Sequence, residues 1–263
     1  MGSLVGKRVV NTRPTHQASE LDELLYARDA QPLSYPCIRI EPPENLATLD
    51  EALCEATRGR FDWLLLTSAN AAHAVAERLT ALGVGALPAA LRLGAIGSGT
   101  AQAVERELGR VPDLLPDEAC AEALLAALPC RPDLRVLLPQ SDLARPLLAR
   151  GLQEQHVTVA AVPAYRTLVG SGGVDLPALL AQRQVDAFIL TSPSTVRNLL
   201  VRLDAEGAPS ETLADIPLAC IGPVTALEAA RLGSLVLEAR QHTLAAVVDE
   251  LDLYFSTGVV RDE

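Results

Sequence analysis

Short apolar runs alternate with amphipathic stretches along nearly the whole chain. A run such as Phe188-Ile189-Leu190 has the length of a buried strand, and the stretches between runs place apolar residues three or four positions apart. Strands that are apolar on both faces are typical of parallel sheets covered by helices. The pattern therefore predicts an α/β protein. The expected strands are 7–10, 31–34, 62–66, 91–96, 135–138, 157–162, 186–190 and 218–221, and the expected helices are 17–28, 46–57, 71–82, 101–108, 119–128, 143–153, 176–183, 195–203, 226–232 and 244–255.

The pattern also repeats within the chain. Residues 61–79 align with 185–203, and a turn rich in glycine and threonine recurs one residue further in register. A fainter match pairs 9–36 with 136–163, so all three matches have an offset near 125 residues. The paired residues are Asp62/Asp186, Leu66/Leu190, Thr67/Thr191, Ser68/Ser192, Arg78/Arg202 and Leu79/Leu203, followed by Ile96-Gly97/Ile221-Gly222 and Thr100-Ala101/Thr225-Ala226.

If the matched segments are called A (9–36 and 136–163), B (61–79 and 185–203) and C (96–101 and 221–226), the chain has the order A-B-C-A-B-C, which is compatible with two architectures. Each A-B-C unit could fold alone, in tandem. Alternatively, the middle B-C-A could form one domain while the first A pairs with the last B-C. The proline-bounded segment 35–43 reads as an extended connector in either case.

Composition narrows the class of protein. Apolar residues make up 49% of the 263 residues but aromatic residues only 3%, so the cores must consist mainly of Leu, Val and Ala. The net charge of −11 argues against a general nucleic-acid footprint. Five cysteines without a Cys-x-x-Cys pair indicate reduced thiols, and no secretory leader or membrane-spanning run is recognised. We expect a soluble, cytoplasmic protein.

Polar turns follow the predicted strands, where open parallel sheets bind ligands. Helix starts at these turns offer free N–H groups and partial positive charge, which suit carboxylate or phosphate. A single Ser, Thr or Asn in such a turn is usually only a helix cap, but six turns in matched domains favour a ligand site. The turns are 11–13, 67–70, 97–100, 139–141, 191–194 and 222–225.

Other motifs with a known chemistry are missing. Gln102 stands where a dinucleotide fingerprint needs glycine after Gly97-Ser98-Gly99, and the Gly-Lys-Ser/Thr end of a P-loop is also missing. The four histidines lack metal-ligand spacing, and no nucleophile elbow occurs. Tyr165 is one of four tyrosines and lies beside Arg166 and Thr167. A phenol there could donate a proton to a leaving oxygen, or simply pack.

Taken in order, these motifs resemble the uroporphyrinogen-III synthase family. The resemblance covers nearly the whole chain. It rests on Asn11-Thr12-Arg13-Pro14, Phe61-Asp62 with Leu66-Thr67-Ser68-Ala69-Asn70, Ala95-Ile96-Gly97 with Thr100-Ala101, Tyr165-Arg166-Thr167, Leu190-Thr191-Ser192-Pro193-Ser194, and Ile221-Gly222-Pro223 with Thr225-Ala226.

The resemblance implies the second architecture. Residues 1–37 and 168–263 would form one domain, and 42–163 an inserted second domain. Each domain would be a flavodoxin-like parallel sheet flanked by helices, and segments 38–41 and 164–167 would be extended connector strands across a deep cleft.

The resemblance also implies a reaction. The linear tetrapyrrole hydroxymethylbilane would lose water, invert ring D through a spiro intermediate and close as uroporphyrinogen III, with no metal or organic cofactor. Tyr165 matches the tyrosine proposed to assist departure of the hydroxyl. Ser68, Thr100, Ser192 and Thr225 match positions that would bind acetate and propionate arms. The further residues expected to bind substrate are Arg13, Asn70, Gly97, Pro193, Ser194 and Gly222.

Two other functions stay open at this point. The chain could be a non-catalytic two-domain sensor or ligand-binding protein of the same fold, or an enzyme acting on another polyanionic metabolite. The expected partner in the leading hypothesis is a polycarboxylate small molecule rather than nucleic acid or membrane. The acidic composition favours a monomer.

Overall fold

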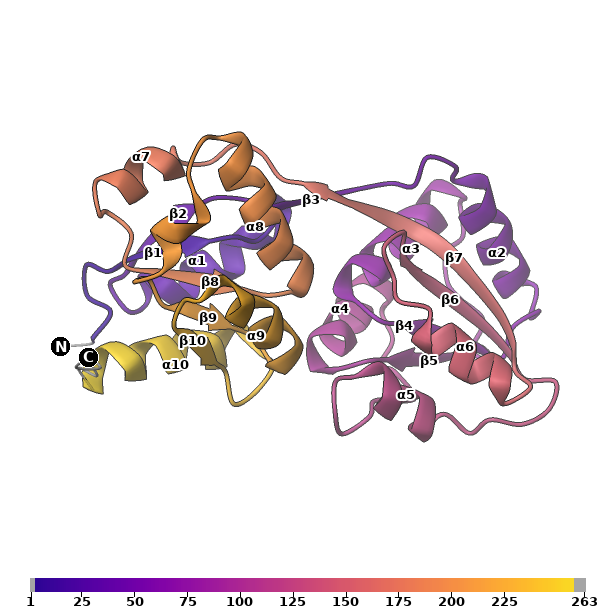
Figure 1. The fold of residues 1–263 in the computed structure, drawn as a ribbon. Coiled ribbons are helices and arrows are strands. Elements are labelled where there is room, and N and C mark those ends of the chain that lie inside the picture. Colours follow the sequence, from indigo (N-terminus) through magenta and orange to yellow (C-terminus); the bar gives the residue numbers. More distant parts are fainter. Residues whose placement is uncertain (1–2, 258–263) are drawn as a thin grey trace. The chain divides into compact units, whose positions relative to one another are not determined.

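The computed structural model describes residues 3–257, which divide into two compact units. The chain up to Arg39 and from Leu168 onward forms unit 1, and Ile40–Thr167 forms unit 2. Each unit holds one five-stranded sheet with helices against it, as Figure 1 shows. The predicted fold class, two similar α/β domains with parallel sheets, is confirmed. No helix within the described residues is long and apolar enough to cross a bilayer.

Unit 1 has the strand order β10-β9-β8-β1-β2, with every pair parallel. Numbered along the unit, this is the flavodoxin-like order 2-1-3-4-5. Its elements are β1 (Arg8–Asn11), η1 (Thr15–Gln17), α1 (Ala18–Tyr26), β2 (Gln31–Ser34), α7 (Leu176–Ala181), β8 (Ala187–Leu190), α8 (Pro193–Ala205), η2 (Ser210–Leu213), β9 (Leu218–Cys220), α9 (Pro223–Ala229), η3 (Ala230–Leu232), β10 (Val236–Glu238) and α10 (Leu244–Thr257).

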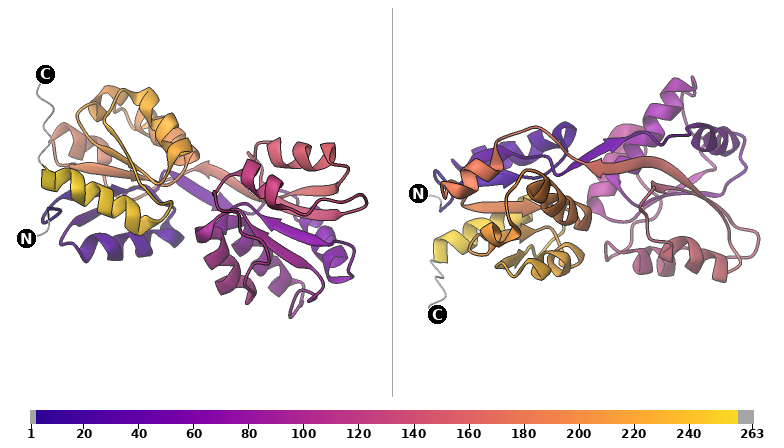
Figure 2. Two further views of the ribbon diagram at one scale, coloured as in Figure 1. Left: turned by 90° about the horizontal axis from the view of Figure 1, so that it is seen from below. Right: turned by 45° about the horizontal axis from the view of Figure 1, so that its top comes forward.

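Alternation along the strands of unit 1 divides its core into two layers. Phe188 and Leu190 pack with α7, α8 and α9, whereas Ala187 and Ile189 pack with α1 and α10. Figure 2 shows α1 and α10 together on one side of this sheet. Both sheet faces are therefore covered, which explains the continuous apolar runs in the sequence.

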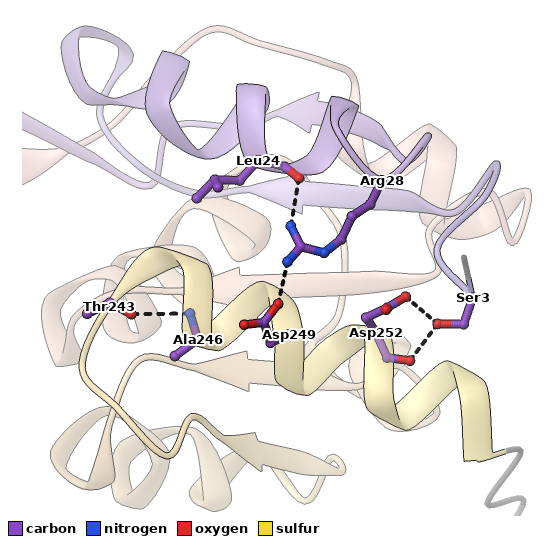
Figure 3. Close-up of polar contacts among 7 residues, drawn as sticks. All are labelled: Ser3, Leu24, Arg28, Thr243, Ala246, Asp249 and Asp252. Carbon is purple, nitrogen blue, oxygen red and sulfur yellow. Dashed lines mark hydrogen bonds and ion pairs between the residues drawn. The ribbon is translucent and has the colours of Figure 1, made fainter. Parts of the chain in front are cut away.

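Polar contacts tie the last helix to the start of the chain. Arg28, just after α1, donates to the Leu24 carbonyl at 3.2 Å and forms an ion pair with Asp249 of α10 (Figure 3). Ser3 donates to the backbone carbonyl and side chain of Asp252, and Thr243 caps α10 by accepting from the Ala246 N–H. The Arg28–Asp249 and Ser3–Asp252 contacts hold α10 against the N-terminal part of the chain.

Unit 2 has the strand order β3-β7-β6-β4-β5. The segment β5-β4-β6-β7 reproduces β9-β8-β1-β2 of unit 1, with each strand in the place of its sequence repeat. Leu114 bridges Gly94 of β5 on the side that β10 occupies in unit 1. Its elements are β3 (Ile38–Glu41), α2 (Ala47–Thr57), β4 (Trp63–Leu66), α3 (Ala69–Ala81), β5 (Arg92–Ala95), α4 (Ser98–Leu108), α5 (Ala121–Ala127), β6 (Arg135–Ser141), α6 (Leu147–Glu154) and β7 (Thr158–Val169).

The structure gives physical reasons for the repeated residues. Asp62 and Asp186 each accept a hydrogen bond from the first backbone N–H of the neighbouring strand, that of Arg135 at 2.9 Å and that of Arg8 at 2.7 Å. Ser68 caps α3 and Ser192 caps α8 through the same extended backbone conformation. The repeat therefore preserves strand registration and helix starts.

Three details differ from the elements expected from sequence. The short strand β10 was missed because Val236–Glu238 lacks a sustained apolar run. Helix α6 begins at Leu147, four residues later than expected, because Pro146 occupies its N-cap. Strand β7 continues to Val169, so the segment 164–167, expected as an extended connector after a strand ending at Val162, is part of the same strand.

Candidate active site

The strongest candidate site lies at the carboxyl edge of the unit 2 sheet, where β4 and β6 are neighbours. Helix α3 follows β4 onto one face of the sheet, and α6 follows β6 onto the other. Chains that leave adjacent strand ends in opposite directions open a crevice between them, the usual ligand position in such sheets. A cavity of about 220 Å3 lies here, lined by Thr67, Ile96, Ala121, Gln140, Ser141, Ala144, Arg145, Leu147, Leu148 and Tyr165.

A register shift brings Tyr165 to this cavity. Gln140 of β6 pairs with Pro163, but the next residue, Ser141, pairs with Tyr165, so β7 carries one extra residue. Such a bulge reverses the alternation of side chains and redirects the residue that follows it. The Asp142 N–H donates to the Tyr165 carbonyl at 3.0 Å, which fixes the backbone there.

The Tyr165 hydroxyl is surrounded by polar side chains. It lies 3.0 Å from the Ser68 hydroxyl and also hydrogen-bonds with the side chains of Asn70 and Ser141. The residue is only 8% exposed, and this burial raises the pKa of the phenol above its ordinary value, although the three hydrogen bonds partly oppose the shift. The phenol therefore stays protonated at neutral pH and can donate its proton or a hydrogen bond.

Ser68 has two roles in this arrangement. Its oxygen accepts from the Ala71 N–H at 3.0 Å and so caps α3, while the same hydroxyl meets Tyr165. Asn70 lies in the first turn of α3 and reaches the same phenol. The structure thus brings together Tyr165, Ser68 and Asn70, three residues that the sequence analysis had proposed for the site.

The other two unit 2 candidates are at the start of α4. Gly97 is the N-cap, and a Cβ there would lie 2.7 Å from Ala119 Cβ, so the close approach of that segment requires glycine. Thr100 is 8% exposed. Both residues build the turn after β5, and they offer a ligand little side-chain surface.

The unit 1 candidates occupy the equivalent strand ends. Arg13 follows β1 and pairs with Glu20 at 3.2 Å; burial lowers the pKa of its guanidinium. Ser192 caps α8 and shares its hydroxyl with Ser194 at 2.9 Å, and Pro193 takes the first helical position. The hydroxyls after β8 are therefore partly satisfied by one another.

Gly222 and Thr225 start α9 in the way that Gly97 and Thr100 start α4. Thr225 is 3% exposed, and a Cβ at Gly222 would lie 2.7 Å from the ring of His242. An exposed histidine thus lies against this turn in unit 1, where unit 2 has Ala119. The role of all these residues in binding stays a prediction.

The sequence analysis missed three polar residues of the cavity. Gln140 and Ser141 belong to the expected turn 139–141, which is the end of β6 in the structure, and neither they nor Arg145 had been assigned a role. Arg145 stands five residues beyond Gln140, just before α6. Only the sheet order shows that this loop faces β4, so no local motif could have selected it.

The part of the chain that the structure describes contains no obvious set of metal ligands. No three His, Cys, Asp or Glu side chains are grouped there so that they could hold a metal ion. The fold and the candidate site define a class: a two-unit α/β protein with a polar, tyrosine-lined cavity at the carboxyl edge of a parallel sheet. Comparison with known proteins gives the family.

The family model described as "Uroporphyrinogen-III synthase HemD" matches residues 19–249. The uroporphyrinogen-III synthase of Synechococcus elongatus is 34% identical over 249 residues, which cover 92% of each chain. A putative uroporphyrinogen-III synthase of Methanothermobacter thermautotrophicus is 28% identical and covers 91% of this chain and 95% of its own. The chain belongs to the uroporphyrinogen-III synthase family.

Solved structures agree at the level of the fold. A mutant uroporphyrinogen III synthase from Thermus thermophilus superposes with a TM-score of 0.65 at 21% identity, covering 96% of this chain and 100% of its own. The uroporphyrinogen-III synthetase of Helicobacter pylori gives a TM-score of 0.56 at 14% identity, covering 96% and 100%.

Proposed function

We propose that this protein closes hydroxymethylbilane to uroporphyrinogen III, with loss of water and inversion of ring D, in tetrapyrrole biosynthesis. Family membership and the full-length relatives support this activity. In the structure, the observation that carries it is the buried Tyr165 phenol at the cavity, hydrogen-bonded with Ser68, Asn70 and Ser141. The enzyme would be a lyase, acting as a cytoplasmic monomer.

Tyr165 is the proposed catalytic residue. The reaction needs a hydroxyl group to leave as water, and a donor near that oxygen would stabilise the charge that develops on it. The phenol keeps its proton because it is buried, and its three polar neighbours limit its orientation. The cation left behind reacts readily, so the protein mainly has to hold the chain ends in a productive pose.

The remaining candidate residues are proposed to bind the acidic arms of the substrate, which carries eight carboxylates. The starts of α3, α4, α8 and α9 present backbone N–H groups beside Ser68, Thr100, Ser192 and Thr225. Such helix starts suit carboxylates. Arg13, Asn70, Gly97, Pro193, Ser194 and Gly222 are assigned the same task, and segments 38–41 and 164–167 are proposed as the connectors between domains.

The test is the isomer formed from hydroxymethylbilane. Hydroxymethylbilane closes spontaneously to the type I isomer, so the protein is supplied with freshly generated hydroxymethylbilane and the products are separated after oxidation. The proposal expects the type III isomer. A product that contains only type I would contradict it and favour a non-catalytic ligand-binding protein of the same fold.

A further inference from the structure

The lining of the cavity beside Tyr165 includes one cation, Arg145. No Asp or Glu, the residues that pair with other arginines of the chain, is among the lining residues. Arg145 is exposed and lines the cavity. Among residues 3–257, no hydrogen bond or ion pair engages its guanidinium in the structure, whereas Arg78 pairs with Asp50 and Arg8 with Asp186. Arg145 thus has no acidic partner there, although the chain has 33 acidic and 22 basic residues.

The nearest acid in sequence is occupied elsewhere. Asp142 accepts hydrogen bonds from the Ser141 hydroxyl at 3.0 Å and from the Thr167 N–H at 3.2 Å. These bonds tie the Asp142 carboxylate to the ends of β6 and β7. The positive charge of Arg145 is thus left available to a ligand.

The rest of the cavity wall indicates what kind of ligand fits. Ile96, Leu147 and Leu148 form an apolar side, while Gln140, Ser141 and Tyr165 supply polar groups. A flat heteroaromatic ring could lie against the apolar side, and a carboxylate on that ring could form two parallel hydrogen bonds with the guanidinium. A pyrrole with acidic side arms has both features.

We propose that the unit 2 cavity takes one pyrrole ring of the substrate and that Arg145 binds a carboxylate arm of that ring next to the Tyr165 hydroxyl. This inference rests on the proposed function and makes Arg145 a specificity-determining residue. Arg145 holds the ring that lies next to the leaving hydroxyl, to which the Tyr165 phenol donates. Arg145 itself takes no part in proton transfer.

The experiment compares Arg145→Gln with Arg150→Gln. Arg150 is an exposed arginine on α6 outside the cavity, so its variant controls for the loss of one positive charge from the same region. The inference expects Arg145→Gln to raise KM for hydroxymethylbilane by about tenfold or more, with kcat nearly unchanged, because a charge-assisted hydrogen bond is lost from both ground and transition states. Arg145→Lys should recover part of the loss.

A second readout does not depend on turnover. Porphobilinogen, a single pyrrole with one acetate and one propionate arm, is titrated into each protein and its binding is followed by ligand NMR. Wild-type protein and Arg150→Gln should bind it, and Arg145→Gln should bind it several-fold more weakly. Added salt should reduce the difference, since it screens the ion pair.

The two proposals fail in different ways. If wild-type protein forms type III product but Arg145→Gln matches Arg150→Gln in both KM and porphobilinogen binding, the Arg145 inference is overturned and the proposed function stands. If wild-type protein forms only type I product while porphobilinogen binding still depends on Arg145, the proposed reaction fails and the carboxylate site remains.

Discussion

The two units share a framework but differ in what they place at the same edge of the sheet. In unit 1, the Thr12 hydroxyl donates to the Ile189 carbonyl at 2.6 Å and closes the junction between β1 and β8. In unit 2, the equivalent junction between β4 and β6 borders the cavity and Tyr165. Two residues beyond the paired prolines Pro36 and Pro163, the first copy of the repeat has the buried Ile38 and the second has Tyr165.

This difference separates scaffold from chemistry. The residues that match between the units, such as Ser68 and Ser192, register strands or cap helices in both. The residues around the phenol that do not match, Ser141 and Arg145, line the cavity of unit 2, which is the proposed site. The internal repeat therefore reports the shared fold, and we propose that the unmatched positions distinguish the function of unit 2. The predictions below test this division, from the largest expected effect to the smallest.

The largest effect is expected for Arg202, which matches Arg78 in the repeat but is used differently. Arg202 is 6% exposed, donates to the carbonyls of Pro36 and Gly172, and pairs with Glu206. Replacing it with Met leaves these acceptors without a donor, so Arg202→Met should cost about 3 kcal/mol. Arg78→Met removes a more exposed pair and should cost about 1 kcal/mol or less.

Urea unfolding monitored by two probes checks this contrast. The single tryptophan, Trp63, is in unit 2, so its fluorescence follows that unit, while circular dichroism follows both. Arg202→Met should shift the dichroism transition most. Equal destabilisation by both variants would mean that the two matched arginines contribute equally to the free energy of unfolding.

The next effect concerns the phenol itself. Tyr165→Phe keeps the ring and its packing but removes the proton donor, so kcat should fall roughly 100-fold while the unfolding midpoint changes little. The matched control is Tyr35→Phe in unit 1, which removes a hydroxyl that bonds Glu206 at 2.9 Å. Steady-state kinetics should show no comparable fall in kcat for the control.

The pH profile adds a second check on Tyr165. Burial raises the pKa of the phenol above the ordinary tyrosine value of about 10. The active, protonated form is therefore lost only when the pH rises above that ordinary value. Activity should therefore not decline between pH 8 and 10 through this group. A decline that disappears in Tyr165→Phe would show that Tyr165 itself titrates in this range and would contradict the raised pKa.

The sequence predicted the scaffold better than the site because different forces set them. Strand and helix positions follow from apolar periodicity, which residues such as Phe188 and Leu190 carry locally. The neighbours of Tyr165 depend on a register shift between Gln140 and Ser141 and on the pairing of β6 with β4. Neither leaves a local pattern, so Ser68 and Asn70 were selected by their motif, while Ser141 and Arg145 were missed.

A smaller effect should separate the two matched serines. Ser68→Ala and Ser192→Ala each remove a helix cap and should each cost about 1 kcal/mol of stability. Only Ser68 contacts the Tyr165 hydroxyl, so Ser68→Ala should also lower kcat about fivefold. Ser192→Ala should instead raise KM, since Ser192 is proposed to bind substrate. Kinetics on both variants decide between these outcomes; a fall in kcat for Ser192→Ala would place it at the chemical step.

The smallest effect is expected at the opposite edge of the sheets, at the paired aspartates. Burial raises the pKa of Asp186, but hydrogen bonds and charge from Arg8 outweigh it, so the net pKa lies below the ordinary value. The stabilisation is therefore present above the unfolded-state pKa near 4 and is lost as the pH falls through the lower folded-state value.

Because Asp186 and Arg8 are partly exposed, Asp186→Asn should cost under about 1 kcal/mol at pH 7. Between pH 5 and 3, the variant should lose less stability than wild-type protein in urea titrations. The same acid sensitivity in wild type and variant would show that Asp186 registers β1 through its backbone contact alone, without any gain from its charge.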